Sequence, residues 1–296
     1  MIEFTDTTFE NKQRASADFA EIAIKVRRDI IKSLVLAKSG HSGGPLGISD
    51  VMSVLFFGGI MNYDPKDPKL KSRDRFVLSA GHMAPVLYSC LARAGYFPPQ
   101  ELASLRKWGT RLQGHPGLDT GLPGIETSSG SLGQGVSIAV GMALSDKLVD
   151  RNGRNVFTVS GDGELQEGAV WEAAMAAANY NLDNLCWIVD NNDCQIDGRV
   201  RDVMNIYPLR SKFEAFNFNV IEIDGHNYAE ILGAFEMFLN HKKQSTGKPT
   251  CIIAKTFMGR GVSFMEDKYS WHGNPPNVEQ ADQALQELII ENCKRI

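Results

Sequence analysis

Two spacings of apolar residues alternate along the chain. Between Ala17 and Lys38, apolar side chains return every three or four positions, which is the spacing of an amphipathic helix. Further helical signals begin at Ser49 and cover 85–94, 136–149, 228–240 and 278–295, whereas apolar runs typical of buried strands begin at Arg75 and cover 155–160, 185–190, 219–223 and 250–256. Strands that alternate with helices predict an α/β fold, a doubly wound parallel sheet with helices on both faces.

Glycine and serine mark the expected ends of several elements. The first helix should stop at Ser39–Gly40, and the glycine-dense stretch SGHSGGPLG that follows is expected to be a loop. Ser49 then has the side chain of a helix N-cap. A second loop-rich stretch runs from Trp108 to Gln134. Loops of this length are unusual inside a folded domain unless they carry function.

Length, charge and cysteine usage narrow the class of protein. With 296 residues, 43% of them apolar, the chain can bury a large core, and no linker divides it, so we expect one domain over residues 1–296. A net charge of −4 without any basic run argues against a nucleic-acid partner. No apolar stretch reaches the ~18 residues of a membrane span, and the first residues lack the pattern of a signal peptide. Five scattered cysteines without C-x-x-C fit a cytoplasmic protein.

Polar residues directly follow two of the predicted strands. Gly161-Asp162-Gly163 comes after strand 155–160, and Asn191-Asn192 comes after strand 185–190, with an alanine-rich helix between them. In a parallel sheet, Asp162 and Asn192 would both lie just beyond the carboxyl ends of their strands, where ligands bind. A carboxylate and an amide oxygen suit a hard cation such as Mg²⁺.

Four of the six histidines stand beside a glycine in predicted loops: His41, His82, His115 and His272. A lone loop histidine is usually bonded to nearby backbone. Four of them favour a site instead, because glycine lets the backbone approach a ligand closely and histidine can move protons near neutral pH.

Signatures of other enzyme classes are absent or misplaced. GSLGQG (130–135) resembles a dinucleotide-binding glycine motif, but it follows a loop rather than a strand. GGPLGISD lacks the lysine of a P-loop, and the sequence contains no H-E-x-x-H.

The order of the remaining motifs is similar to one enzyme family. GDG and NN are separated by 27 positions (164–190), which resembles the thiamine diphosphate fingerprint. Joined in order to SGHSGGPLG, RDRFVLSAGH, GHPG, SSGSLGQG, GDGELQEG, IDGR and WHG, this pattern resembles the first, diphosphate-binding domain of transketolase over about residues 15 to 277.

The resemblance implies thiamine diphosphate as cofactor and Mg²⁺, with Ca²⁺ or Mn²⁺ as substitutes. The implied metal ligands are the Asp162 carboxylate, the Asn192 amide oxygen and the main-chain carbonyl of Cys194. Gly163 is expected to start the helix whose N-terminal end faces the diphosphate. The remaining cofactor contacts implied by the family are Gly130, Ser131, Leu132, His82 and His272.

Roles for the other histidines and one acid also follow from the resemblance. His41, His115 and His272 are implied to be catalytic and to face the hydroxyls of the sugar donor. Glu167 resembles the family's carboxylate that couples two active sites across a dimer, although an acid at a helix N-terminus has a simpler explanation in the helix dipole. The sequence departs from the family pattern at two places: Ser42 stands where many relatives have proline, and the late loop has one histidine where many have two. The second departure concerns substrate contacts more than cofactor binding.

The family also implies a missing partner. Transketolases normally continue into a pyrimidine-binding domain, which supplies a cofactor-activating Glu and most arginines for the sugar phosphate. The starting Met and the terminal helix favour a natural N-terminal subunit of a split enzyme over a truncated chain. The expected function is transfer of a two-carbon ketol unit from a ketose phosphate to an aldose phosphate, together with a separate C-terminal subunit.

The expected assembly is a two-plus-two heterotetramer in which this chain dimerises through the alanine-rich helix 168–179. Two alternatives stay open at this point. The α-type subunit of a 2-oxo-acid dehydrogenase also carries GDG and NN, but it lacks SGHSGG and SAGH. A cofactor-binding module without catalysis is the second, although it would have no need for four loop histidines.

Overall fold

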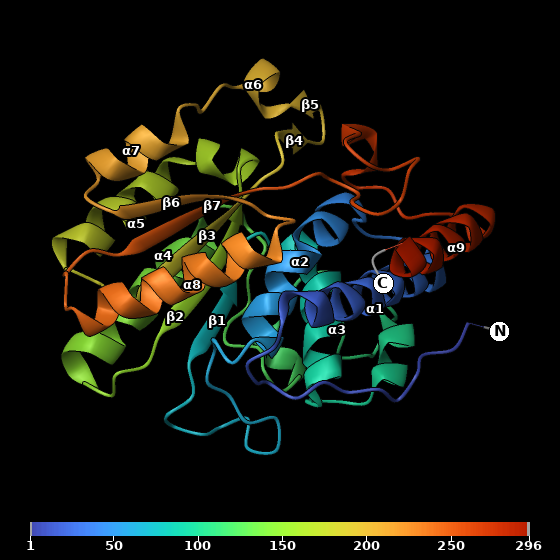
Figure 1. The fold of residues 1–296 in the computed structure, drawn as a ribbon, viewed down its shortest axis with the longest axis horizontal. Helices are drawn as coiled ribbons and strands as arrows, with labels where there is room; N and C mark the ends of the chain where they lie inside the picture. The colour runs from blue at the N-terminus through green and yellow to red at the C-terminus, as the bar shows by residue number, and fades with distance from the viewer. Residues whose placement is uncertain (1, 295–296) are drawn as a thin grey trace.

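A five-stranded sheet forms the centre of the computed structural model, which describes residues 2–294. Across the sheet the order of strands is β1 (Arg75–Leu78), β2 (Val156–Gly161), β3 (Leu185–Asn191), β7 (Thr250–Lys255) and β6 (Asn219–Asp224). Each neighbouring pair is parallel. The predicted fold class is therefore confirmed, and Figure 1 shows the sheet with helices packed around it.

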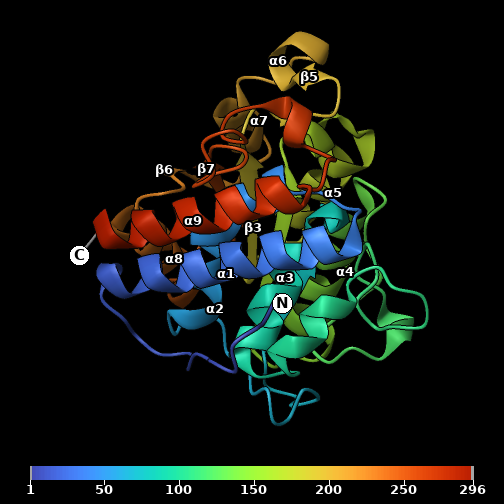
Figure 2. The same ribbon diagram turned by 90° about the vertical axis from the view of Figure 1, so that its right-hand side faces the viewer.

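The two faces of the sheet belong to two separate hydrophobic clusters, because successive side chains of a strand point to opposite faces. In β3, Cys186 and Ile188 enter one cluster, whereas Leu185, Trp187 and Val189 enter the other. The first face is covered by α1 (Ser16–Ala37), α2 (Gly43–Phe57), α3 (Ala84–Ala94), α8 (Tyr228–Lys243) and α9 (Val278–Lys294). The second is covered by α4 (Gln134–Leu144), α5 (Gly168–Asn179) and α7 (Leu209–Ala215). Helices α1 and α9, far apart in the sequence, lie side by side (Figure 2).

The start of α2 differs from the prediction. The helix begins at Gly43, inside the stretch expected to be a loop, and Ser49 is not an N-cap. Ser49 is fully buried in the middle of α2, where its hydroxyl donates to the Pro45 carbonyl. Burial of this whole helix outweighs the low helix propensity of its first glycines, since tertiary packing routinely overrides propensity.

Two other helix ends also differ from the prediction. Helix α1 ends at Ala37, and its C-cap residue Lys38 itself adopts the left-handed conformation (φ 52°), so no glycine is needed there. Gly163 begins only a short 3₁₀ turn, Gly163–Gln166, and α5 starts five residues later at Gly168. The predicted last residue of α9, Arg295, lies outside the described residues.

Residues 194–218 contain elements that the apolar pattern did not predict. They form the short antiparallel pair β4 (Cys194–Gln195) and β5 (Gly198–Arg199), the single turn α6 (Val200–Val203), and α7. These elements are too short for a periodic signal. The pair β4–β5 and α6 stand above the carboxyl ends of β2 and β3 (Figure 1), whereas α7 packs on the second face of the sheet.

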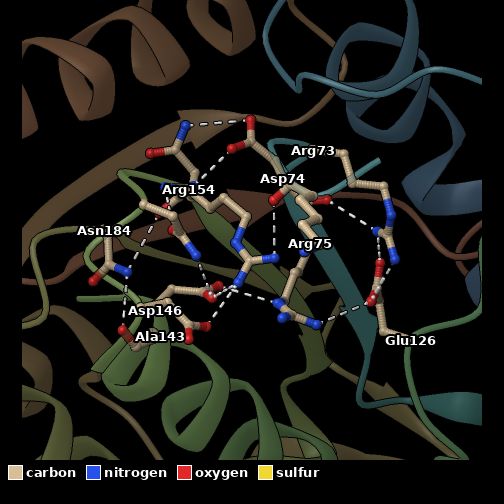
Figure 3. Close-up of polar contacts among 12 residues, drawn as sticks. Arg73, Asp74, Arg75, Glu126, Ala143, Asp146, Arg154 and Asn184 are labelled. Atoms are coloured by element: carbon tan, nitrogen blue, oxygen red, sulfur yellow. Dashed lines mark hydrogen bonds and ion pairs between the residues drawn. The ribbon is translucent and has the colours of Figure 1, made fainter. Parts of the chain in front are cut away.

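The opposite, amino-terminal edge of the sheet is held together by ion pairs (Figure 3). Arg75, the first residue of β1, reaches Asp146 at the end of α4 with an N–O distance of 3.1 Å. Arg154 also pairs with Asp146, and Arg73 pairs with Glu126. These ion pairs fix the amino-terminal edge of the sheet. The candidate site is formed by the loops at the opposite, carboxyl-terminal edge. Within residues 2–294, no helix combines the length and hydropathy needed to cross a membrane.

Candidate active site

A cavity of about 320 Å³ opens at the carboxyl ends of β2 and β3. Its walls come from loops that are distant in the sequence, including those that carry the four glycine-flanked histidines. Of the residues singled out in the sequence, all except Ser131 line it, namely His41, His82, His115, Gly130, Leu132, Asp162, Gly163, Glu167, Asn192, Cys194 and His272.

Asp162 and Asn192 are brought together by the pairing of β2 with β3. The register places Gly161 opposite Asp190, so the two polar turns leave the sheet side by side. The Asp162 carboxylate accepts hydrogen bonds from the amides of Gly163 (2.8 Å) and Asp193 (2.5 Å). Both side chains are largely buried.

Asp190, which sequence reasoning did not select, connects this pair. Its carbonyl accepts a hydrogen bond from the Asp162 amide at 3.1 Å, and its carboxylate accepts one from the Asn192 side-chain amide at 2.8 Å. Thr256 on the far side donates to the same carboxylate. Burial raises the pKa of Asp190 to about 6. In the sequence, Asp190 could have been selected because it is an acidic residue at the end of an apolar strand, immediately before Asn191-Asn192.

The donor set fits a hard divalent cation. Burial and the nearby Asp190 charge raise the pKa of Asp162 well above its usual range, so an ionised carboxylate here is costly without a cation. Among the described residues no three His, Cys, Asp or Glu side chains form a metal cluster. That leaves the expected mixed set of carboxylate, amide oxygen and main-chain carbonyl, which is the oxygen chemistry that Mg²⁺ prefers. The Cys194 thiol itself has its pKa raised to about 11 by burial.

Glu164 is a second buried acid that sequence reasoning missed. It accepts hydrogen bonds from the Gly133 amide (2.8 Å), the Gly161 amide (3.2 Å) and the Ser79 hydroxyl. Burial raises its pKa. Glu164 therefore ties the end of β1 and the start of α4 to the GDG turn, and it fixes the shape of the cavity. The sequence feature that could have identified Glu164 is its position directly after Gly161-Asp162-Gly163.

Three imidazoles form a compact cluster on another wall of the cavity. The ring centroids of His41 and His82 are 5.0 Å apart, those of His82 and His272 are 5.1 Å apart, and those of His41 and His272 are 5.6 Å apart. The Nδ1 atoms of His41 and His272 are buried and have no hydrogen-bond partner in the described chain. Buried polar atoms without partners indicate a place for a ligand.

The electrostatics of the cluster favour neutral imidazoles. Burial, together with His272, Arg106 and His115, lowers the pKa of His41 to about 4. Burial, together with the neighbouring imidazoles, also lowers the pKa of His82 well below its usual value. Burial also lowers the pKa of His272, and a hydrogen bond to the Cys194 backbone partly opposes that shift. A neutral imidazole can both donate and accept a hydrogen bond, so the cluster can bind polar groups without bringing a positive charge into the cavity.

His115 and Glu167 stand at the border of the cavity. The His115 ring lies against Gly130, where a Cβ atom would be only 2.4 Å from the ring Cδ2, so this position admits only glycine. Burial lowers the pKa of His115. Glu167 precedes α5 but its side chain makes no capping hydrogen bond there, so its contribution to the helix is at most electrostatic.

A family model described as "Transketolase, thiamine diphosphate binding domain" matches residues 20–294. The transketolase of Homo sapiens is 42% identical over 280 residues, which are 93% of this chain and 43% of the human protein. The crystal structure of transketolase from Campylobacter jejuni superposes with a TM-score of 0.81 at 31% identity, covering 94% of this chain and 45% of that one.

A shorter relative matches over almost its full length. The "6-deoxy-6-sulfo-D-fructose transketolase subunit SqwG" of Clostridium sp. (strain MSTE9) is 40% identical over 278 residues, which are 92% of this chain and 98% of the relative. This chain thus spans less than half of the human and Campylobacter proteins, but nearly all of a relative that is named as a subunit.

Proposed function

The chain belongs to the transketolase family through its thiamine diphosphate-binding domain, and on that premise we propose that it is the N-terminal subunit of a two-component transketolase. The reaction is transfer of a two-carbon ketol unit from a ketose phosphate to an aldose phosphate. The activity requires a separate C-terminal subunit with a pyrimidine-binding domain. We propose one domain over residues 1–296 and, from the free buried cysteines, a cytoplasmic enzyme.

The observation that carries the proposal is the joint placement of acid, amide and imidazoles around one cavity. Asp162 and Asn192 line the same cavity as the cluster of His41, His82 and His272. The α-type subunit of a 2-oxo-acid dehydrogenase would share Asp162 and Asn192, but not the histidine cluster. The coverage of the shorter relative supports the split form.

Thiamine diphosphate, when bound, would supply the carbon nucleophile on which ketol transfer depends. Asp162, Asn192 and the Cys194 carbonyl would hold Mg²⁺ against the diphosphate. Gly130, Leu132, Gly163 and His82 would contact the cofactor; Ser131, outside the cavity lining, would act only through its backbone position. His41, His115 and His272 would orient the donor's hydroxyls and move protons at its carbonyl oxygen.

Assembly with a second copy is part of the proposal. The outer face of α5 exposes Met175, and a Cβ atom at Gly168 would meet nothing within 4 Å. Small and apolar side chains on an open helix face suit close packing against a symmetric copy. Two such chains with two C-terminal subunits would form a heterotetramer, with Glu167 near the shared axis.

Reconstitution tests the function directly. The chain is mixed with its candidate C-terminal subunit, thiamine diphosphate and Mg²⁺, and transfer to an aldose phosphate is followed with two donors, a ketopentose phosphate and 6-deoxy-6-sulfo-D-fructose. Transfer from a phosphorylated donor supports the proposal. Oxidative decarboxylation of a 2-oxo acid, or no turnover with a partner that binds, would contradict it.

A further inference from the structure

The hydroxyl of Ser42 joins two segments that meet at the cavity from opposite ends of the chain. Ser42 follows His41 directly and is fully buried at the start of α2. Its Oγ lies 2.7 Å from the Asn274 carbonyl oxygen and 3.2 Å from the Trp271 carbonyl oxygen. A hydroxyl has one proton to donate, so the two carbonyls share it. These two acceptors flank His272, so Ser42 connects the two imidazole-bearing segments.

The segment 269–274 packs on the protein through Trp271, which lies against the larger hydrophobic cluster and the ring of Phe264. Its backbone and side-chain hydrogen bonds, apart from those described next, are local: the Trp271 amide donates to the Lys268 carbonyl, the His272 amide to the Tyr269 carbonyl, and the Asn274 side chain to the Ser270 carbonyl. Among the described residues, two sets of hydrogen bonds attach this segment to distant parts of the chain. One is the bond of the His272 ring to the Cys194 backbone, and the other is the pair of bonds from the Ser42 hydroxyl.

Packing beside Ser42 leaves the two segments almost no separation. A Cβ atom at Gly43 would lie 2.3 Å from Met258 Cγ and 3.0 Å from the Trp271 carbonyl oxygen. On the other side, a Cβ atom at Gly273 would lie 3.6 Å from His41 Nε2. Gly43 permits the close approach, since a Cβ atom there would clash, whereas one at Gly273 would only be in ordinary contact with His41. The hydroxyl of Ser42 bonds across the same contact. The outcome is the edge-on arrangement of His41 and His272, with ring planes at 83°.

We propose that Ser42 is a positioning residue whose hydroxyl sets the spacing of His41 and His272 around the donor sugar. This inference rests on the proposed function, in which both imidazoles contact the donor. Ser42 hydrogen-bonds neither the acid–amide pair nor the GDG turn, and His272 is only one of several implied cofactor contacts, so the effect of Ser42 should fall on the donor far more than on the cofactor.

Ser42→Ala is the test, with Ser49→Ala as the matched control. Both serines are fully buried on the same helix, and each donates to a backbone carbonyl at 2.7 Å, but Ser49 bonds only within α2. Both variants are studied in the complex with the C-terminal subunit. The readouts are the melting temperature, thiamine diphosphate affinity, kcat and KM for the donor, and the imidazole NMR signals of histidine-labelled chain.

The expected result is a loss of about three- to tenfold in kcat/KM for the donor in Ser42→Ala, the size of one lost hydrogen bond. Cofactor affinity should stay unchanged, and the signals of His41 and His272 should shift. Ser49→Ala should change neither kinetics nor these signals. Ser42→Cys, which keeps the volume but is a weak donor, should show the same loss.

The proposal is overturned if Ser42→Ala and Ser49→Ala have the same donor kinetics and the same imidazole signals. The NMR comparison needs no turnover. If the wild-type complex transfers no ketol unit, the proposed function fails, whereas the positioning of His41 and His272 by Ser42 is still decided by the signals.

Discussion

The main-chain amide of Asp162 donates to the main-chain carbonyl of Asp190 at 3.1 Å, so two buried carboxylates project from adjacent strand ends. Each lacks a cationic side chain within its own hydrogen-bond contacts. Close like charges away from water are unfavourable unless a cation neutralises them. This relationship motivates the first two predictions.

Asp162→Ala should abolish metal-dependent cofactor binding, because it removes the only anionic ligand of the proposed set and Mg²⁺ would bind together with the diphosphate. Titration of the reconstituted complex with thiamine diphosphate in the presence of Mg²⁺ measures this. Asp202→Ala, an exposed acid on α6, is the control. Wild-type affinity in Asp162→Ala would falsify the assignment.

Asp190→Asn should weaken Mg²⁺ binding by roughly 10- to 100-fold, the usual effect of removing a partner that orients a metal ligand. An asparagine can still accept from Asn192 and donate to Thr256, so the fold should persist while the charge is lost. The measurement is a Mg²⁺ titration at saturating cofactor. Thr256→Val, which keeps the carboxylate, should have a smaller effect; equal losses would point to general loosening of the strand ends.

His41→Ala and His272→Ala should each lower kcat by roughly 10²–10⁴, the range for groups that act in proton transfer. Cofactor affinity and the melting temperature should change little. His241→Ala is a matched control, because His241 also has a buried Nδ1 without partner but lies on α8, away from the cavity. A variant that melts far below wild type yet keeps its specific activity would show a structural role for that histidine.

The free energy of unfolding should depend on pH through the titration of His41. Its folded pKa, about 4, lies below the ordinary 6.5 because of burial, so the unfolded chain binds more protons between these values. The stability contributed by neutral His41 is present above 6.5 and is lost as the pH falls toward 4. In His41→Gln, which has no titratable imidazole at this position, the loss of stability at low pH that His41 causes should be absent.

Thermal melts of wild type and His41→Gln from about pH 7 to about pH 5 test this sign. The melting temperature of the variant should rise relative to wild type as the pH falls. A constant difference across the range would mean that His41 titrates normally in the folded protein.

The isolated chain should form a dimer without ketol-transfer activity. Met175→Glu on the open face of α5 should shift it toward monomer, since a buried unpaired charge disfavours an interface. Met237→Glu, at a similarly exposed methionine on α8, should not. Sedimentation of each variant measures the state. A monomeric wild type that turns over ketose phosphate unaided contradicts the split-enzyme proposal.

Local sequence patterns were enough for the parts of this fold that are long and uniform. The apolar runs of β2 and β3 and the spacing of GDG and NN predicted neighbouring strand ends, because parallel pairing leaves few alternatives. The same reasoning found Asp162 and Asn192, which follow those strands directly. The four histidines beside glycine could be selected for a similar reason, because the glycine that marks each of them is its neighbour in the sequence.

Tertiary contacts decided the rest. The helical start of α2 depends on tertiary burial. The bonds of Asp190 to Thr256, of Glu164 to Gly133, and of Ser42 to residues 271 and 274 all join groups that are far apart in the sequence. A buried hydroxyl or carboxylate must find a partner wherever the packed fold supplies one. No window of sequence contains both members of such a pair, so the chemistry of single residues could be predicted from the sequence, but only folding determined which of them meet.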